Sequence, residues 1–154
     1  MLIYVNSQVT EASKTKLNCM FSDVLAPVPE DAHATIVYGR VYDTSVAACE
    51  LEDEAVLNLN SAKSSSALIT GLQWWPGHDL RGYIVAILDS DYLHARNAVW
   101  RELCVPLGLY RPHITLVKYI EEAHAQSLMR HVGLFTPRLP CFIHLEKEIF
   151  KLWK

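Results

Sequence analysis

The sequence has no pair of cysteines at short spacing. Its four cysteines are scattered through 154 residues, and none belongs to a Cys-x-x-Cys motif. Such pairs mark most zinc sites and disulfide frameworks, so we expect the cysteines to be reduced and to act as small apolar side chains. A His-Glu-x-x-His motif is also missing from the sequence. The residues therefore predict no bound metal and no other cofactor.

Long apolar runs and an excess of basic charge are missing as well. No run approaches the length of a membrane span, and residues 1–5 lack the basic start and long apolar stretch of a signal peptide. The net charge is -3, from 14 basic and 17 acidic residues. Proteins that bind long DNA or RNA need a broad basic surface. We therefore predict a cytoplasmic protein with neither a membrane nor a long nucleic acid as partner, and a small phosphodiester remains a compatible ligand.

Apolar residues make up 51% of the chain, which is enough for the core of a single domain over residues 1–154. Alternating or continuous apolar runs predict strands, and apolar residues three and four apart predict helices. Residues 43–65 have no clear pattern. The other expected elements are a strand at 2–9, a helix at 10–24, strands at 33–38, 66–75 and 82–88, a helix at 89–103, a strand at 113–119, a helix at 121–133 and a final strand or hairpin at 139–153.

Several of these strands follow one another without an intervening helix. This order favours a largely antiparallel sheet with helices on its outer faces, which is an α+β domain.

One short motif occurs twice, at residues 33–37 (HATIV) and 113–117 (HITLV). Of the seven histidines, only His33 and His113 have a threonine two positions later, at Thr35 and Thr115. Residues i and i+2 of a strand share a face, so each histidine points the same way as its threonine. A single copy is usually an accident, and a lone histidine on a strand is more often a structural group. Two copies that both open an apolar strand favour a functional pair.

Two imidazoles and two hydroxyls that converge on one cleft suit the cleavage of a phosphodiester without a metal. One histidine removes a proton from the attacking oxygen, and the other protonates the departing oxygen. Imidazole serves both roles near neutral pH because its ordinary pKa is about 6.5. The threonine hydroxyls can hydrogen-bond to the non-bridging phosphate oxygens. The sequence leaves open which histidine is the base and which is the acid.

The paired motifs resemble those of the two-histidine (2H) phosphoesterases, which include 2′-5′ RNA ligase-like proteins and 2′,3′-cyclic nucleotide phosphodiesterases. The motif histidines lie 80 residues apart, and the passage from Gly82 through residues 110–113 is also similar. The resemblance implies two lobes, with two pseudo-symmetric antiparallel sheets and outer helices flanking a central cleft. It places the two histidines and two threonines of the motifs at the catalytic positions.

Within this family, the chain looks most like the viral anti-CBASS enzymes, because it is small and has more acidic than basic residues. That resemblance implies hydrolysis of 3′-5′ linkages in cyclic oligonucleotide messengers of bacterial antiviral defence, in the cytoplasm of the host cell. Two alternatives stay open. One is an enzyme that acts on 2′,3′-cyclic or 2′-5′ RNA ends, and the other is a non-catalytic sponge that binds a cyclic nucleotide and releases it intact.

Candidate substrate-binding residues lie outside the motifs. Adjacent strand residues face opposite sides, so one of Trp74 and Trp75 is expected to pack in the core while the other stacks on a base. Glu146 is expected to share a face with Glu148 and to contact a ribose hydroxyl or a base edge, whereas Lys118 faces away from His113 if its strand is regular. For most of these residues, packing or a solvated surface position is an equal or better interpretation. The full set of candidates is Tyr4, Trp74, Trp75, Tyr110, Arg111, Glu146 and Trp153.

Overall fold

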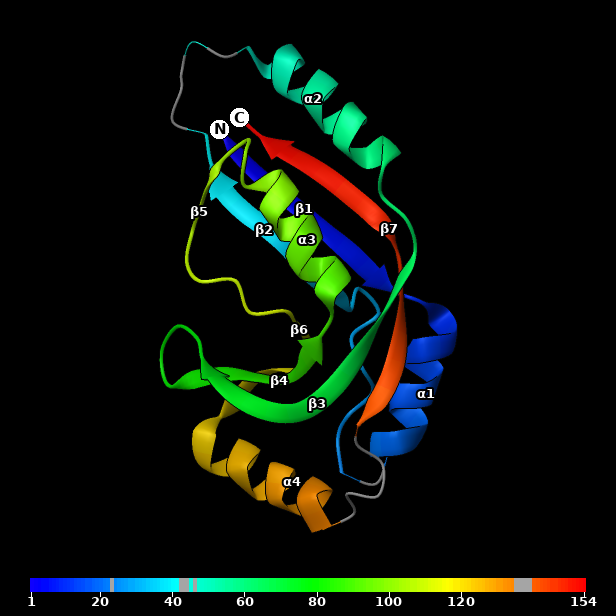
Figure 1. Ribbon diagram of the computed structural model, residues 1–154. Helices are drawn as coiled ribbons and strands as arrows, with labels where there is room; N and C mark the ends of the chain where they lie inside the picture. The colour runs from blue at the N-terminus through cyan, green and yellow to red at the C-terminus, as the bar shows by residue number, and fades with distance from the viewer. Residues whose placement is uncertain (23, 42–44, 46, 135–139) are drawn as a thin grey trace.

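The computed structural model describes residues 1–22, 24–41, 45, 47–134 and 140–154. Strands and helices within these ranges follow one another as expected for an α+β chain (Figure 1). The elements are β1 (Leu2–Val9), α1 (Glu11–Phe21), β2 (His33–Arg40), α2 (Ala48–Asn60), β3 (Ser65–Pro76), β4 (Arg81–Asp89), α3 (Asp91–Trp100), β5 (Val105–Pro106), β6 (His113–Glu121), α4 (Glu122–Leu134) and β7 (Cys141–Trp153).

The strands form one antiparallel sheet that closes on itself. Their order is β1-β7-β3-β4-β6-β2-β5, and β1 also pairs with β2, so six strands complete a ring and β5 extends from β2. The pairing between β2 and β6 is the shortest in the ring, because only Ala34 and Ile114 are partners there. Both predicted motifs therefore lie at the seam of the barrel.

The two separate sheets that the resemblance implied are not found, because two long strands join the halves of the molecule. β7 pairs with β3 through Cys141–Leu145 and with β1 through Leu145–Trp153. β3 pairs first with β7 and then with β4. Strands of 12 and 13 residues are long enough to have a different neighbour in each half, so the sheet is continuous.

Helices cover the barrel from several sides. In Figure 1, α2 and α3 lie over the half formed by β1, β2 and the end of β7, while α4 lies below β3 and β4, and α1 runs beside the start of β7. The largest fully buried side chains of the core are Trp100, Ile3, Leu17, Ile36, Ile69, Ile84, Leu93, Ile114, Leu116, Ile143, Leu145 and Val5.

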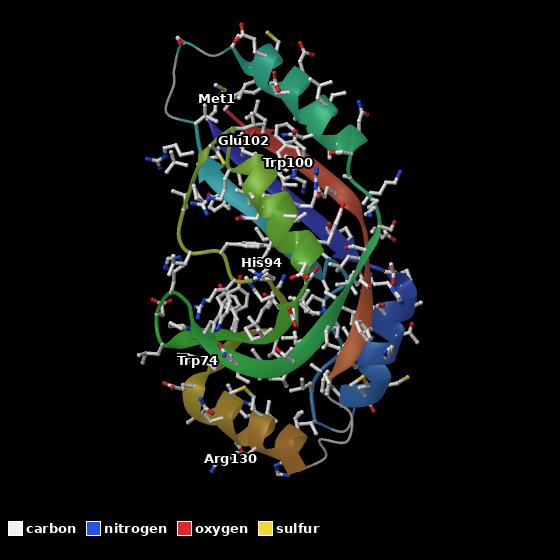
Figure 2. The ribbon with its side chains drawn as sticks, in the orientation of Figure 1. Met1, Trp74, His94, Trp100, Glu102 and Arg130 are labelled. Atoms are coloured by element: carbon white, nitrogen blue, oxygen red, sulfur yellow. The ribbon has the colours of Figure 1, made fainter. Side chains whose placement is uncertain are left out.

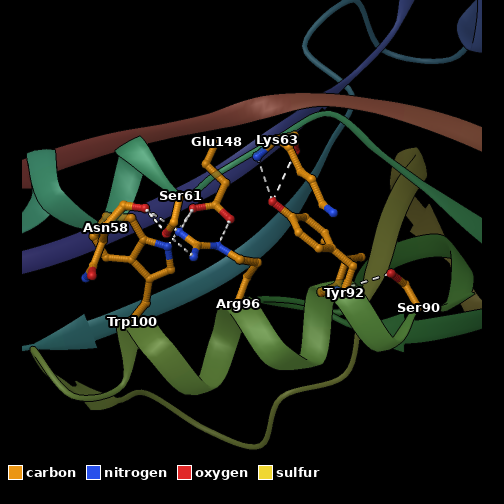
Figure 3. Close-up of polar contacts among 9 residues, drawn as sticks. Asn58, Ser61, Lys63, Ser90, Tyr92, Arg96, Trp100 and Glu148 are labelled. Carbon is orange, nitrogen blue, oxygen red and sulfur yellow. Dashed lines mark hydrogen bonds and ion pairs between the residues drawn. The ribbon is translucent and has the colours of Figure 1, made fainter.

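A buried ion pair fastens α2 and α3 to β7 (Figure 3). The guanidinium of Arg96 donates to both carboxylate oxygens of Glu148, at 2.5 and 3.0 Å. Nη1 donates to the Ser61 hydroxyl, and Nη2, which also bonds Glu148, donates to the Asn58 carbonyl. The Trp100 indole donates to Glu148 at 2.7 Å. Figure 2 places Trp100 at α3, and its ring stacks on Phe150 of β7. These polar groups satisfy one another, which is what a buried charge requires.

Most predicted elements are present, with shifted ends. α1 ends at Phe21 and α3 at Trp100, each three residues before its predicted end, and β7 is one strand rather than a hairpin. α2 was not predicted, although Leu51, Ala55 and Leu59 recur every four residues and contact the core. Residues 43, 44 and 46 of the unassigned stretch and residue 139 of the predicted final strand lie outside the described residues.

All four cysteines are free: Cys104 and Cys141 are buried as expected, while Cys19 and Cys49 are exposed. In the described parts of the chain, no helix is both long and apolar enough to cross a membrane.

Candidate active site

The two predicted motifs meet face to face across the barrel seam. Ala34 pairs with Ile114 in antiparallel register. In such a pair, the residue before one partner lies opposite the residue after the other, so His33 faces Thr115 and Thr35 faces His113. Ala34 and Ile114 are fully buried, whereas the four motif side chains are half-buried on the other face of the strands. Directly opposed side chains have Cβ atoms roughly 5 Å apart. The structure therefore brings the four predicted catalytic residues together.

Both imidazoles are oriented by the same backbone contact. The Nδ1 of His33 lies 2.7 Å from the carbonyl oxygen of Asp31, and the Nδ1 of His113 lies 2.8 Å from that of Arg111. A carbonyl only accepts, so Nδ1 carries the proton in both rings. Each neutral imidazole therefore has its lone pair on Nε2, the nitrogen that can exchange a proton with a substrate.

A β-bulge follows each motif and changes which residues face the site. Val5 pairs with Val37 but Asn6 pairs with Thr35, so the register skips Ile36. In β6 the register skips Leu116 in the same way. An extra residue shifts the alternation of side chains, which turns Tyr38 and Lys118 to the face of the motif residues. The prediction that Lys118 faces away was wrong for this reason.

The surroundings of His33 are polar and aromatic. The Tyr4 hydroxyl lies 2.5 Å from Nε2 of His33 and 3.4 Å from the Thr35 hydroxyl. The Tyr4 ring stacks on Trp153, with centroids 5.5 Å apart, and Tyr38 meets both rings edge-on. Tyr4 and Trp153, two predicted substrate-binding residues, thus border the His33 side of the site, with Trp153 and Tyr38 partly exposed.

An acidic and a basic residue border the same side. The Asp31 carboxylate lies 3.4 Å from the Nζ of Lys118, and both line a cavity of about 40 Å³ with His33 and Thr115. Desolvation would raise the pKa of Asp31. The nearby Lys118 charge and its hydrogen bond outweigh that effect, with a smaller contribution from His33, so the pKa lies below its ordinary value. Asp31 is therefore a carboxylate at neutral pH and attracts positive charge on the His33 ring.

The His113 ring is less solvated than the His33 ring. Its ring packs against Trp75, with centroids 4.3 Å apart, and the Arg111 guanidinium stacks over the same indole at 4.3 Å. Burial lowers the pKa of His113, the hydrogen bond to the Arg111 carbonyl opposes this change, and the charges of His33 and Arg111 lower the pKa further. The neutral form of His113 is therefore favoured.

A cavity of about 230 Å³ opens beside His113 and Thr35, and the loop between β5 and β6 forms one of its walls. Trp75, Tyr110 and Arg111, all predicted to bind substrate, line this cavity. The Tyr110 hydroxyl is buried without a hydrogen-bond partner, and its ring meets edge-on the ring of His94 on α3, which Figure 2 labels. Burial first and the Glu148 charge second raise the pKa of Tyr110, so this hydroxyl stays protonated at neutral pH.

The tryptophan pair divides as alternation predicted. Trp74 packs against the core and its indole donates to the Ile120 carbonyl at 3.2 Å, so it faces away from the site occupied by Trp75. Trp74 was one of the predicted substrate contacts, and the structure gives it a packing position instead.

Glu146 and Glu148 do not share a face, contrary to prediction. The register of β7 against β1 shifts between Leu145 and Glu148, which places Glu146 at a bulge opposite Gln8, the partner of His33. Glu146 is exposed on the side of the site, while Glu148 belongs to the buried ion pair.

The sequence-based predictions missed or wrongly oriented three residues of the site: Asp31, Tyr38 and Lys118. Each bulge does have a sequence signal. Two consecutive apolar residues at 36–37 and again at 116–117 interrupt the strict alternation that a regular strand requires. Asp31 has no such signal, because only the fold brings it next to Lys118. The described residues contain no group of three or more His, Cys, Asp or Glu placed to hold a metal ion, and the independence from metal remains a prediction.

The two His-x-Thr motifs face each other across one strand pair, as the resemblance to two-histidine phosphoesterases predicted for the catalytic residues. Residues 2–136 match the family model described as "Anti-CBASS protein Acb1", so the chain belongs to that family. This match confirms the resemblance drawn from the paired motifs.

Solved structures share the fold at low sequence identity. The chain is similar to Usb1 of Kluyveromyces marxianus, with a TM-score of 0.60, 10% identity, and coverage of 97% of this chain and 93% of that one. The same protein with uridine monophosphate gives a TM-score of 0.61 at 12% identity, with the same coverage of 97% and 93%. No curated protein sequence matches the chain.

Proposed function

We propose that this chain is a metal-independent phosphodiesterase that cleaves 3′-5′ linkages of cyclic oligonucleotide messengers. The observation that carries the proposal is the apposition of the motifs, in which each histidine faces the threonine of the other motif and has Nε2 as its reactive nitrogen, with the Tyr4 hydroxyl beside Nε2 of His33. Membership of the anti-CBASS family supports the choice of substrate.

Different surroundings support different roles for the two histidines in the proposed reaction. A general base must be neutral before it acts, and burial against Trp75 favours neutral His113. A general acid must be protonated, and His33 has the Asp31 carboxylate nearby and a Tyr4 hydroxyl that can accept its Nε2 proton. His113 is therefore the base and His33 the acid in the proposed reaction.

In the proposed reaction, Nε2 of His113 takes the proton of the ribose 2′-hydroxyl, whose oxygen attacks the adjacent 3′ phosphorus. The bond from phosphorus to O5′ breaks, and Nε2 of His33 gives its proton to that oxygen. The ring opens to a linear product with a 2′,3′-cyclic phosphate. Thr35 and Thr115 donate hydrogen bonds to the non-bridging oxygens, where negative charge increases in the transition state.

The rim of the site fits a small ligand with several bases. Tyr4, Tyr38 and Trp153 form one aromatic group beside His33, and Trp75 lies beside His113. A base that stacks on an aromatic side chain gains about 1–3 kcal/mol. With a net charge of -3, binding that depends on a few donors and on stacking suits a cyclic dinucleotide or trinucleotide better than a long polyanion.

The test is incubation with a panel of 3′-5′ cyclic dinucleotides, linear 2′-5′ oligoribonucleotides and RNA with 2′,3′-cyclic ends, in excess chelator, with products identified by mass spectrometry. We expect linear products from the cyclic dinucleotides. Cleavage of only the linear or cyclic-ended RNA would make the chain an RNA-end enzyme. Tight binding with no turnover would make it a sponge, and loss of activity in chelator that zinc or manganese restores would overturn the metal-independent mechanism.

A further inference from the structure

We propose that Lys118 binds the reacting phosphate, by leaving the Asp31 carboxylate for a non-bridging phosphate oxygen when substrate enters. The inference rests on the proposed phosphodiesterase function and adds a residue that neither motif contains.

The backbone of β6 is irregular on both sides of Lys118. The register with β4 skips Leu116 before it and Tyr119 after it, while Lys118 itself pairs with Tyr83. Tyr119 has φ of 59°, a left-handed conformation that residues other than glycine rarely adopt. A regular strand would turn Lys118 away from Thr115. The bulge at Leu116 turns the Lys118 side chain to the face of the site, and the strained Tyr119 follows it directly. Retained strain of this kind concentrates at functional positions.

The position of the ammonium group suits a phosphate between the motifs. Lys118 shares a small cavity with His33 and Thr115, which are the acid and one hydroxyl donor of the proposed reaction. On the other half of the site, the Arg111 guanidinium is stacked over Trp75. Lys118 therefore supplies positive charge on the side where the leaving oxygen and His33 lie, and where negative charge on phosphorus oxygens increases.

The contact with Asp31 is one that a phosphate can replace. The two charged atoms are 3.4 Å apart, and the side chains are 41% and 69% exposed. An exposed ion pair of this length contributes little to stability. A charge-assisted hydrogen bond to a phosphate oxygen is shorter and stronger, and the released carboxylate is solvated. Asp31 thus keeps Lys118 near the site without holding it tightly.

The experiment compares Lys118→Met, which keeps the length of the side chain but removes its charge, with Lys118→Arg and wild type. The matched control is Lys16→Met on α1, whose Nζ contacts the carbonyl of Phe142 away from the motifs. With the cyclic dinucleotide that wild type cleaves fastest, we expect Lys118→Met to lower kcat/KM by about 10- to 100-fold, somewhat less than the loss of a buried oxyanion donor. Lys118→Arg should recover most of the activity, and Lys16→Met should match wild type.

A second measurement separates this inference from the proposed function. Lysine side-chain signals are followed by NMR while inorganic phosphate is added, and the Nζ signal of Lys118 should move while that of Lys16 does not. If wild type cleaves but Lys118→Met equals wild type, the inference is wrong and the function stands. If wild type cleaves nothing in the panel, the function is wrong, and an unmoved Lys118 signal then overturns the phosphate contact as well.

Discussion

The two halves of the site are built alike around their histidines. Each motif opens a strand, each Nδ1 is held by the carbonyl two residues earlier, and each register skips the residue after the threonine. Their surroundings differ. His33 has the Tyr4 hydroxyl and the Asp31 carboxylate beside it, whereas His113 is buried against Trp75.

In the proposed reaction, this difference suits the two copies of the motif to unlike roles. An acid and a base must hold opposite protonation states at one pH, and two identical pockets would hold both rings in the same state. Environments that separate two pKa values allow both roles at once. Here the repeated backbone contact orients each ring, and the side chains that are not repeated favour the neutral form of His113.

The largest expected effect comes from removing either histidine. His33→Ala and His113→Ala should each lower turnover by about 10²–10⁴-fold, and the double variant should be much less than additive because the two residues act together. The two single variants should differ in activity on a substrate in which sulfur replaces the leaving O5′. A thiolate leaves without a proton because thiols are far more acidic than alcohols, so this substrate should restore much of the activity of His33→Ala.

His113→Ala should stay slow with the sulfur substrate, since its missing step is removal of the proton from the nucleophile. Rescue of His113→Ala instead of His33→Ala would reverse the assignment of acid and base. Near-full turnover of either single variant on the natural linkage would mean that the histidine is structural.

The second largest effect is expected in the free energy of unfolding, from the buried ion pair between α3 and β7. Glu148→Gln leaves the Arg96 guanidinium buried without its anion. Breaking such a pair costs about 3–5 kcal/mol, so the free energy of unfolding in urea should fall by that amount. The exposed neighbour Glu146→Gln is the matched control and should leave stability within about 0.5 kcal/mol of wild type. An equal, small loss for both variants would mean that Glu148 carries no buried charge.

The repeated features of the site were predictable from the sequence, and the unrepeated ones largely were not. The motif residues and the division of Trp74 from Trp75 follow from strand alternation, which is a local rule. The contact between Asp31 and Lys118 joins residues 87 positions apart, and it depends on a bulge that a regular strand pattern does not include. The single closed sheet was also missed, because pairing of β7 with two different strands is decided by packing of the whole chain rather than by any local pattern.

A smaller effect is expected in the pH dependence of kcat/KM, which distinguishes the roles of the two histidines. Because burial lowers the pKa of His113, the acid limb of kcat/KM should lie below the ordinary histidine value of about 6.5, with activity rising as His113 loses its proton. Trp75→Ala exposes the ring and weakens the desolvation, so the pKa should rise and the acid limb should move to higher pH. We expect the rate at the optimum to fall about 10-fold from lost stacking.

Tyr4→Phe is the matched control in the pH measurement. It removes a hydroxyl from the His33 half and leaves the surroundings of His113 unchanged, so the acid limb should keep its wild-type position. Movement of the acid limb in Tyr4→Phe but not in Trp75→Ala would assign the base to His33.

The smallest effect is expected at Glu146, which lies on the side of the site but outside the apposed motifs. Its bulge is opposite Gln8, and Gln8 pairs with His33, so two strand spacings of about 4.8 Å each separate Glu146 from the histidine strand. An exposed carboxylate at that distance can contact a ribose hydroxyl or a base edge but not the reacting phosphate. Glu146→Gln should therefore raise KM about 2- to 10-fold and leave kcat within twofold, because it removes binding that is equal in the ground and transition states. Steady-state kinetics on cyclic dinucleotides with different bases measures this split, with the exposed Glu52→Gln on α2 as control. A fall in kcat would place Glu146 in the chemistry and extend the asymmetry of the two half-sites to β7, and an unchanged KM with every base would remove it from the substrate contacts.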